Sequence, residues 1–426
     1  MAPPPRSVWL VTLYYAHGWE HGSHLRTFAI ARDWVRRGAA VHFVAVEFDH
    51  TDPTLPGPYL ERLRAERVIT GFDRLRLRHT WFRGKVARAV LHPAARDVAL
   101  GPERRGMIAS LDAVTRTVAP DAFVITDPHL LFAAPHLRRY APVTIDWKDS
   151  HTLQYARAQR GALRRRDWRE AASLQFRTWE SALYERYYGR RADHNVLVSP
   201  VDAAEMARVI GSAATVHTVA NGIRARPTPT AVVHEPDRLI FTGTMDFGPN
   251  HHSALWFIRE VLPRVVARRS GVRFVVAGTN PAPELRALAG PNVEVTGWVD
   301  DMRGELARSA LYVAPMVEGS GFKNKVVEAL AAGVCVVGTS MAFEFLPDRL
   351  RTLFSAADDP EGLAAVILDV LDRPSENAAT VAEFWRRAGD EYEWGQVAER
   401  FAGVVDAPSR RDARAVAPDA AVLQRA

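Results

Sequence analysis

The chain has 426 residues, enough for two domains, and 47% of them are hydrophobic, as in soluble globular proteins. The formal net charge of +6 comes from arginine, since only four of the 55 basic residues are lysines. This balance suits phosphorylated ligands or anionic membrane surfaces, and a nucleic-acid partner is not expected. The single cysteine, Cys335, excludes a disulfide framework, favours the cytoplasm and predicts a buried structural thiol. No apolar stretch is long enough to span a membrane, and the sequence contains neither a zinc-ligand spacing nor a P-loop motif.

Strand-like and helix-like segments alternate along the chain, which predicts an α/β fold with parallel sheets and crossover helices. The first unit is a strand at Val8–Leu13, a loop with Gly18 and Gly22, and a helix from Ser23 to Arg37. Further strands are expected at Val41–Val46, Ala122–Thr126, Pro142–Trp147 and Asn195–Pro200, with an arginine-rich helical stretch from Leu153 to Arg191.

A second α/β series follows an Asn-Gly turn and the proline-spaced segment Arg226–Thr230, which predict a domain boundary near residue 226. Its five expected strands are Arg238–Thr244, Arg273–Gly278, Val293–Trp298, Leu311–Pro315 and Val334–Gly338. Residues 376–402 are expected to form terminal helices. We therefore predict a Rossmann-like domain over residues 1–225, a second one over 226–402 and a disordered tail over 403–426.

The most informative segment runs from Pro315 to Thr339 and reads as strand, glycine loop, helix, glycine stop and strand. Gly319 and Gly321 let the backbone approach a ligand closely, and the helix that follows offers free N–H groups to a phosphate. Lys325 and Glu328 are three residues apart and share one helix face. A cation for phosphate and a carboxylate for hydroxyl groups indicate a nucleotide site; an ordinary α/β unit with solvated charges is the alternative.

The order and spacing of several short motifs point to one family. The motifs are Asn221-Gly222-Ile223, Thr242–Met245, Ala277-Gly278, Val295–Asp301, Gly319–Ala332 and Gly333–Val337. Together they resemble the retaining glycosyltransferases of family 4, whose GT-B fold has two facing Rossmann-like domains and a cleft between them. The resemblance runs from Val8 to about Phe401. It is closest to a branch that has Pro249-Asn250 and the run Gly321–Glu328, and that serves polysaccharide and natural-product glycosylation.

The resemblance implies a donor motif in which two glutamates are separated by seven residues. The second is Glu328, which would bind the nucleotide ribose. The first position is Ser320, so either the Ser320 hydroxyl or the carboxylate of Glu318 would meet the donor sugar. The family's basic pair after the first strand of the second domain is absent from Gly243–His251. Lys325, with Lys323, is expected to neutralise the diphosphate instead.

The nucleotide base is expected against the Gly297–Asp300 loop. Trp298 as core filling and Glu328 as a plain surface acid are the alternatives. The residues expected to hold the donor are Gly18, Gly22, Gly243, Trp298, Val299, Glu318, Gly319, Ser320, Gly321, Phe322, Lys323 and Glu328.

The first domain is expected to carry the acceptor. Asp149 and His151, with Lys148, follow the strand Pro142–Trp147, and ligands of α/β sheets gather at the carboxyl ends of strands. They are candidates for an acceptor base or a sugar-orienting pair, and Lys325 completes the catalytic set. The alternative is an N-cap aspartate and a surface histidine. Arg26 is more typical of a surface residue than of a ligand.

The implied reaction moves a sugar from a nucleoside diphosphate sugar to an acceptor hydroxyl, with retention of anomeric configuration. No metal and no further cofactor are expected. A GT-B epimerase and a non-catalytic sugar-nucleotide-binding partner are the alternatives; donor turnover with and without an acceptor distinguishes them. Ten arginines against four acidic residues between Arg157 and Arg191 indicate either a solvated helical face or a peripheral contact with anionic lipid or an acidic acceptor.

Overall fold

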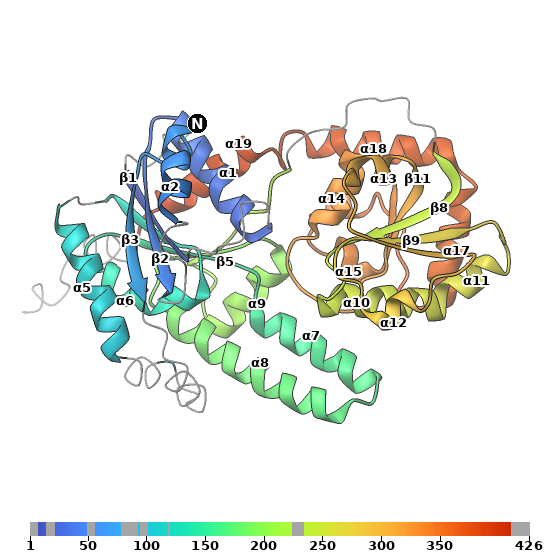
Figure 1. Ribbon diagram of the computed structural model, residues 1–426, viewed down its shortest axis with the longest axis horizontal. Helices are drawn as coiled ribbons and strands as arrows, with labels where there is room; N and C mark the ends of the chain where they lie inside the picture. Colours follow the sequence, from blue (N-terminus) through green and yellow to red (C-terminus); the bar gives the residue numbers. More distant parts are fainter. Residues whose placement is uncertain are drawn as a thin grey trace, which may run out of the picture.

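A computed structural model describes residues 7–13, 22–48, 56–77, 93, 101–117, 120–223 and 234–409. Within these ranges the chain forms two α/β domains, each built on a parallel sheet (Figure 1). The first sheet has the order β3-β2-β1-β4-β5-β6-β7, and the second has the order β10-β9-β8-β11-β12. The predicted fold class is confirmed.

The elements of the first domain alternate as the sequence predicts. They are β1 (Ser7–Leu13), α1 (Gly22–Arg36), β2 (Ala40–Phe48), α2 (Pro56–Ala65), β3 (Gly71–Leu77), α5 (Gly101–Thr117), β4 (Ala122–Ile125), η1 (Pro128–Ala133), α6 (Ala134–Leu137), β5 (Val143–Lys148), α7 (His151–Arg164), α8 (Trp168–Gly189), β6 (His194–Leu197), α9 (Pro200–Ile210) and β7 (Val216–Thr218). The central strands β1 and β4 are almost entirely buried and apolar, as expected of strands covered on both faces.

The second domain contains the five predicted strands. Its elements are β8 (Glu235–Thr242), α10 (Gly248–Trp256), η2 (Phe257–Val261), α11 (Leu262–Val266), β9 (Arg273–Ala277), α12 (Pro283–Arg286), β10 (Val293–Gly297), α13 (Met302–Ala307), β11 (Ser309–Ala314), α14 (Asn324–Ala331), β12 (Val336–Gly338), α15 (Ser340–Phe343), α16 (Asp348–Arg351), α17 (Pro360–Leu371) and α18 (Pro374–Ala388).

The sequence analysis did not predict the two edge strands of the first sheet, β3 and β7. The strand β3 carries Asp73, Arg74 and Arg76 among its seven residues, and its first four residues are half-buried or exposed. An edge strand is paired on one side only and tolerates polar side chains, so it lacks the continuous apolar pattern of a central parallel strand.

The last helix, α19 (Trp394–Val405), returns to the first domain and lies beside α1 (Figure 1). The indole Nε1–H of Trp34 donates to the carbonyl of Ala398 at 2.9 Å, and the ring of Phe401 meets that of Trp34 edge-on at 5.7 Å. The sequence analysis assigned this segment to the second domain and started a disordered tail at residue 403. The helix instead continues to Val405, because its apolar face fills the core of the first domain. The boundary near residue 226 lies outside the described residues.

The predicted helical stretch from Leu153 to Arg191 is a hairpin of two helices, α7 and α8, that projects beside the two domains (Figure 1). The break falls at Arg166, whose φ is 61°, and Asp167 caps the start of α8 by accepting from the amide of Glu170. No helix within the described ranges is both long enough and apolar enough to span a membrane.

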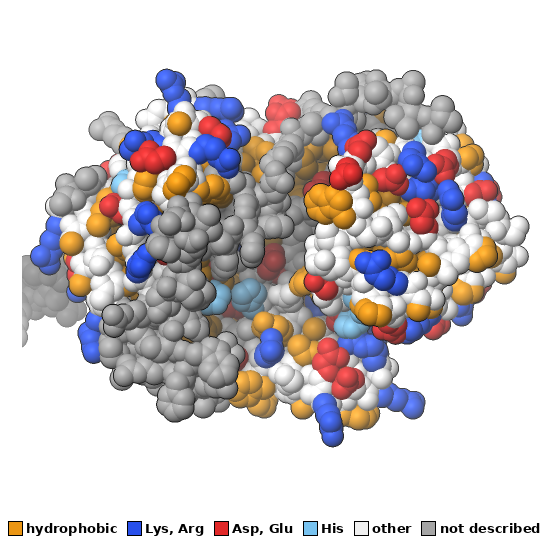
Figure 2. All heavy atoms as spheres, viewed as in Figure 1, with side chains coloured by type: hydrophobic (Ala, Val, Ile, Leu, Met, Phe, Trp, Pro, Cys, Tyr) orange, Lys and Arg blue, Asp and Glu red, His pale blue; other side chains and the backbone are white. Residues whose placement is uncertain are grey.

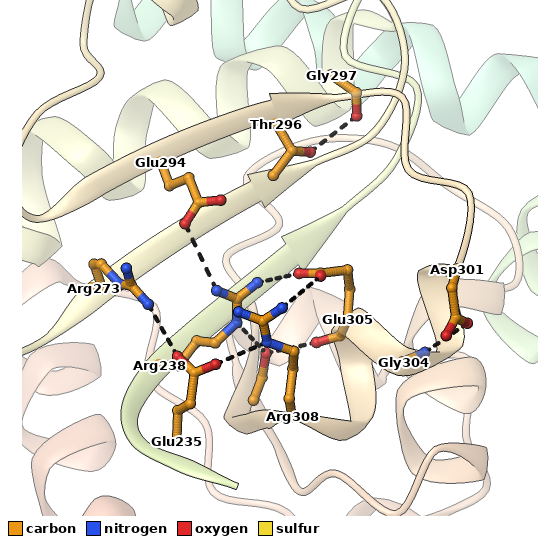
Figure 3. Close-up of polar contacts among 11 residues, drawn as sticks. Glu235, Arg238, Arg273, Glu294, Thr296, Gly297, Asp301, Gly304, Glu305 and Arg308 are labelled. Atoms are coloured by element: carbon orange, nitrogen blue, oxygen red, sulfur yellow. Dashed lines mark hydrogen bonds and ion pairs between the residues drawn. The ribbon is translucent and has the colours of Figure 1, made fainter.

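A charge network ties the first strand of the second sheet to its neighbours. It comprises Glu235, Arg238, Arg273, Glu294, Glu305 and Arg308 (Figure 3). The Arg238 side chain is only 2% exposed; it contacts Glu305 closely and lies 3.7 Å from Glu294. Figure 3 shows this network away from Gly297, where β10 ends. The network therefore stabilises the sheet at a distance from the loops that form the candidate site.

Candidate functional site

The candidate site lies between the two domains, where Figure 2 shows a hollow with histidine and acidic side chains at its floor. The loops that follow β4 and β5 reach it from the first domain, and the loops that follow β8 and β11 reach it from the second. Hydrogen bonds cross from one domain to the other: Arg157 donates to the Gly319 carbonyl at 2.9 Å, and Asn221 donates to Asn324 at 3.1 Å. The two domains therefore meet at the predicted glycine loop.

The glycine loop before α14 is docked on the first domain. The amide of Gly321 donates to Asp202 at 2.9 Å, and Gly321 has a φ of +75°, which favours glycine. A Cβ at this position would lie 2.0 Å from Oδ1 of Asp149. Gly319, with a φ of +112°, accepts from Arg157 through its carbonyl. The two glycines thus let the backbone of this loop pack closely against the first domain.

The two lysines of the loop have different environments. The buried Nζ of Lys323 donates to the carbonyls of Ser320 and Gly321 at 2.8 and 3.1 Å and lies 3.7 Å from Glu344. Burial lowers the pKa of Lys323, while Glu344 and two aspartates oppose the shift. Lys323 therefore braces the loop from within, and Lys325 is the lysine that faces the second-domain glycine turn.

Lys325 is half-buried beside the loop that follows β8. Its Nζ donates to Asn250, lies 4.6 Å from the centre of the Phe241 ring, and would be 3.1 Å from a Cβ on Gly243. Burial, followed by the nearby Lys323, lowers the pKa of Lys325 to about 7, and Glu328 opposes the shift. The absence of a side chain on Gly243 is what leaves room for this ammonium group.

Glu328 is exposed on the same helix, one turn after Lys325. The protein atoms around it raise the pKa of its carboxyl, and Lys325 opposes the shift. The apolar face of α14 is buried by Val326, Val327 and Leu330. The helix therefore presents its lysine and glutamate away from the core of the second domain, as their spacing predicts.

The two candidates for the first motif position differ in burial. Glu318 is 2% exposed, contacts Nδ1 of His252 closely and lies 3.9 Å from Arg165 of the first domain. Its carboxylate is therefore occupied by partners within the protein. Ser320 is half-buried in the glycine loop. Of the two, Ser320 has the more exposed side chain.

Phe322, expected among the donor-binding residues, is buried in the second domain. Its ring contacts the rings of Phe345 and Tyr392 at centroid distances of 4.5 and 5.7 Å. Its side chain therefore anchors the glycine loop to the core. Val299 is likewise packed against that core.

Trp298 is not core filling. Its side chain is 72% exposed, and its Nε1–H donates to Asp300 at 2.8 Å. Gly297 before it has a φ of +74°, which turns the chain out of β10. An exposed indole at a strand's carboxyl end offers a flat apolar surface for stacking.

Two glycines of the first domain were also expected among the donor-binding residues. Gly22 begins α1, and Gly18 lies outside the described residues.

On the first domain, Asp149 faces the glycine loop and is not the cap of α7. The N-cap is Ser150, whose hydroxyl accepts from the amide of Leu153. Burial, followed by the nearby Asp202, raises the pKa of Asp149 to about 6, and basic residues around it oppose the shift. Its carboxyl is therefore mostly ionised at neutral pH and can accept a hydrogen bond there.

His151 is the first residue of α7 and is half-buried. Burial lowers its pKa, as does the neighbouring His129, so the imidazole is neutral at pH 7. The start of α7 is held by Glu185 of α8, which accepts hydrogen bonds from the Ser150 hydroxyl at 3.2 Å and from the Thr152 amide at 3.1 Å. The position of His151 therefore depends on a buried carboxylate.

Two basic residues, Lys148 and Arg26, lie close to the end of β5 near Asp149. Lys148 has a φ of +67°, a conformation rare outside glycine, and its Nζ donates to the Thr126 carbonyl at 3.1 Å. Arg26 is only 1% exposed and pairs with Asp146 at 3.1 Å. The expectation that Arg26 is a surface residue is wrong, because the buried Asp146 draws it inward.

Asp127 and His129, after β4, belong to the same surface and were missed from the sequence. Asp127 caps η1 and accepts from the His129 amide at 2.8 Å. The His129 side chain is 67% exposed, with Nδ1 2.9 Å from Asp127. The signal was available, because Asp127 directly follows the predicted strand Ala122–Thr126 and strands of a parallel sheet end at one edge.

Cys335 is buried, and burial raises its pKa to about 11, which confirms the predicted structural thiol.

Among the described residues, no group of three or more His, Cys, Asp or Glu side chains is placed to hold a metal ion. A separate cavity of about 780 Å³ lies behind the glycine loop, lined by Met316, Glu344 and Phe354 among others. It contains none of the predicted donor or acceptor residues.

The family model of the group 1 glycosyl transferases matches residues 236–373, which form most of the second domain. The chain is 28% identical to a phosphatidyl-myo-inositol mannosyltransferase of Mycolicibacterium smegmatis over 236 residues, 51% of this chain and 60% of that protein. It is 30% identical over 158 residues to the gpi3 subunit of a phosphatidylinositol N-acetylglucosaminyltransferase of Schizosaccharomyces pombe, 34% of each chain. The chain thus spans 60% or less of the length of these relatives.

Solved structures share the whole fold. Anabaena HepE in complex with UDP has a TM-score of 0.62 at 13% identity, over 93% of this chain and 98% of that one. TarM has a TM-score of 0.65 at 8% identity, over 95% and 100%. At such identities the similarity establishes the fold.

Proposed function

We propose that this chain, a GT-B-fold glycosyltransferase whose second domain matches the group 1 glycosyl transferases, moves a sugar from a nucleoside diphosphate sugar to an acceptor hydroxyl with retention of configuration. The observation that carries the proposal is the placement of Lys325. Its ammonium lies over Gly243 and beside Asn250, one helical turn before the exposed Glu328. The ammonium group of Lys325, next to the bare backbone of Gly243, suits a diphosphate. The carboxylate of Glu328 on the same helix face suits the ribose hydroxyls.

The leaving group explains why a cation is needed. Cleavage of the bond between the sugar and the diphosphate leaves negative charge on the β-phosphate oxygen. A diphosphate beside Lys325 raises the pKa of its ammonium, so that the lysine is fully charged when the charge develops. The helix dipole of α14 acts in the same direction, because the lysine lies in its first turn.

The acceptor hydroxyl is assigned to the first-domain side of the cleft. Asp149, mostly ionised at neutral pH, accepts a hydrogen bond from the acceptor, and the neutral His151 orients the donor sugar. In the family that the chain resembles, the leaving phosphate itself takes the acceptor proton on the face it departs from. That route gives retention and asks for no strong protein base.

The named relatives support the donor half of the proposal. HepE is solved with UDP, with UDP-glucose, and with UDP and glucose, and it shares the complete fold. The mycobacterial relative is named as a mannosyltransferase. The match of the family model is confined to the second domain, so the identity of the acceptor depends on the first domain. We infer a cytoplasmic reaction that needs no metal.

The proposal is tested by incubating the purified chain with UDP- and GDP-sugars, with and without a panel of hydroxyl acceptors. Release of nucleoside diphosphate that depends on the acceptor, with an α-linked product from an α-linked donor, is the expected result. Donor conversion to an epimer without acceptor would replace the proposal with an epimerase. Nucleotide binding without any turnover would leave a binding protein.

A further inference from the structure

The α7–α8 hairpin carries an unusual share of exposed apolar surface. Of the large hydrophobic side chains that are exposed in the described part of the chain, four lie on this hairpin: Leu163 (39%), Trp168 (67%), Phe176 (43%) and Trp179 (61%). Trp168 and Leu163 are at its tip, on either side of the turn. A solvated helical face does not need two tryptophans that are more than half exposed.

A set of apolar residues of α8 follows a helical spacing. Trp168, Ala172, Phe176, Trp179 and Leu183 are separated by four, four, three and four residues, so they form one stripe along the helix. The stripe spans 15 residues, which is roughly 22 Å at the rise of an α-helix. Trp168, Ala172, Phe176 and Trp179 are all exposed, and the helix buries a different set, which includes Ala171, Glu185 and Tyr188.

Arginines lie on the same hairpin as this stripe. The side chains of Arg160, Arg166 and Arg169 are exposed, and none of these side chains forms a hydrogen bond or an ion pair within the described part of the chain. Arg164 is also exposed, but it lines the cavity beside Met316 and Val317 of the second domain. Arg165 differs, because it pairs with Glu170 at 2.9 Å and lies 3.9 Å from Glu318. Figure 2 shows basic, acidic and hydrophobic side chains side by side on the projecting part of the first domain. Three unpaired cations near two exposed indoles suit an anionic partner with an apolar interior.

A membrane fits these observations better than a second copy of the chain. Two copies that paired through this stripe would bring their unpaired arginines together, and like charges that meet at an interface weaken it. Indole rings favour the boundary between lipid headgroups and acyl chains, and arginines favour anionic headgroups. The turn between the helices is 14 residues of α7, or roughly 21 Å, from His151 at the cleft.

We propose that the α7–α8 hairpin docks this chain on an anionic lipid surface, with Leu163, Trp168 and the α8 stripe inserted at the headgroup level and the arginines on the lipid phosphates. Because the stripe runs along α8, the hairpin lies lengthwise on the membrane surface. This inference rests on the surface of the hairpin and stands independently of the reaction proposed above.

The first test is co-sedimentation of the full chain with vesicles of phosphatidylcholine alone and of phosphatidylcholine with phosphatidylglycerol at 30%, at low salt. We expect strong binding to the anionic vesicles only, weakened at higher ionic strength. Exchange of Arg160, Arg166 and Arg169 for glutamine should lower the partition coefficient roughly 100-fold, since each arginine near an anionic surface strengthens binding roughly fivefold. The matched control exchanges Arg264, Arg268 and Arg303, which are exposed on the second domain, and should leave binding unchanged.

The apolar half of the proposal has its own variants. The double change Trp168→Ser and Trp179→Ser should lower binding about tenfold or more at unchanged melting temperature, because both side chains are already largely exposed. Trp298→Ser removes an equally exposed indole from the second domain and should not change vesicle binding.

A site-specific probe locates the contact. The chain's only cysteine is buried, so Ala172→Cys can be labelled with an environment-sensitive fluorophore, with Ser270→Cys on the second domain as control. Anionic vesicles should shift the emission at position 172 to the blue and leave position 270 unchanged. Equal binding to both vesicles, or binding that the hairpin variants do not alter, overturns the proposal. So does concentration-dependent self-association without lipid that the tryptophan variant abolishes, which would make the stripe a contact between copies.

Discussion

The backbone amide of Gly321 donates a hydrogen bond to the carboxylate of Asp202, across 2.9 Å and from one domain to the other. The other oxygen of the same carboxylate accepts from the amide of Ser150, just before α7. One buried side chain thus fixes both the glycine loop and the helix that begins with His151.

The first prediction concerns Gly321→Ala. The residue has a φ of +75°, and a Cβ would lie 2.0 Å from Asp149, so the loop must move away from the first domain. We expect kcat/KM to fall roughly 100-fold or more, as for misplaced catalytic groups. Gly38→Ala is the matched control, because its φ is +93° and nothing lies within 4 Å. It should cost about 1 kcal/mol of stability and leave activity intact. Full activity of Gly321→Ala would contradict the docked loop.

The second prediction concerns Arg157, which donates to both carboxylate oxygens of Glu344 at 2.5 and 2.8 Å. Both side chains are largely buried between the domains. Arg157→Ala should lower kcat/KM about tenfold or more, on the scale of one charge-assisted contact, and enlarge the radius of gyration in small-angle scattering. Arg349→Ala breaks an exposed ion pair within the second domain and should change neither quantity. An unchanged radius for Arg157→Ala would mean that other contacts hold the domains.

The third prediction concerns Glu328→Ala. If the carboxylate accepts the ribose hydroxyls, nucleoside diphosphate affinity should fall by about 2–3 kcal/mol, the range for charge-assisted hydrogen bonds. Titration calorimetry measures this directly. Glu361→Ala, at an exposed site on the same domain, serves as control. Unaltered affinity in Glu328→Ala would remove the ribose role.

The fourth prediction concerns protonation of Lys325, whose pKa is lowered to about 7. Above that pH the free protein holds it neutral, and a bound diphosphate recharges it, so nucleotide binding at pH 8 should take up a proton. Calorimetry in buffers of different ionisation enthalpy measures the uptake, which Lys325→Met should abolish. The same lysine is charged in the unfolded chain up to about pH 10, so stability from this group should rise with pH between about 7 and 10.

Turnover offers a second measurement on Lys325. Because charge grows on the leaving diphosphate, Lys325→Met should lower kcat about tenfold or more. A mutant with a normal kcat and only a raised KM would show that the lysine binds substrate and transition state alike.

The fifth prediction concerns Asp149, whose pKa is raised to about 6. If the ionised carboxyl accepts the hydrogen bond of the acceptor, kcat/KM should fall as the pH drops through about 6. Asp149→Asn should remove this limb and lower transfer about tenfold or more, as is typical for groups of this kind. Nucleotide affinity should stay within about twofold, since the proposed function assigns the nucleotide to α14. His151→Ala should behave similarly with a smaller loss. An acid limb that persists in Asp149→Asn would assign the titration to another group.

The sequence alone determined the features that are local along the chain. Apolar runs of four to seven residues between helical segments gave the central strands of both sheets, because a strand covered on both faces can hold few polar side chains. The glycine loop and the Lys325–Glu328 pair were equally readable, since backbone turns and helix faces depend on residues close in sequence.

The tertiary structure decided which charges meet. Glu318 is occupied by His252, Lys323 is turned into its own loop, Arg26 pairs with Asp146, and α19 completes the core of the first domain. These partners are separated by up to several hundred residues, and no spacing rule connects them. Their pairing follows from burial, because a charge inside a domain must find a partner wherever the fold brings one. The sequence therefore determined the elements and the loop chemistry, and the packing of two domains decided which of those groups remain free for a ligand.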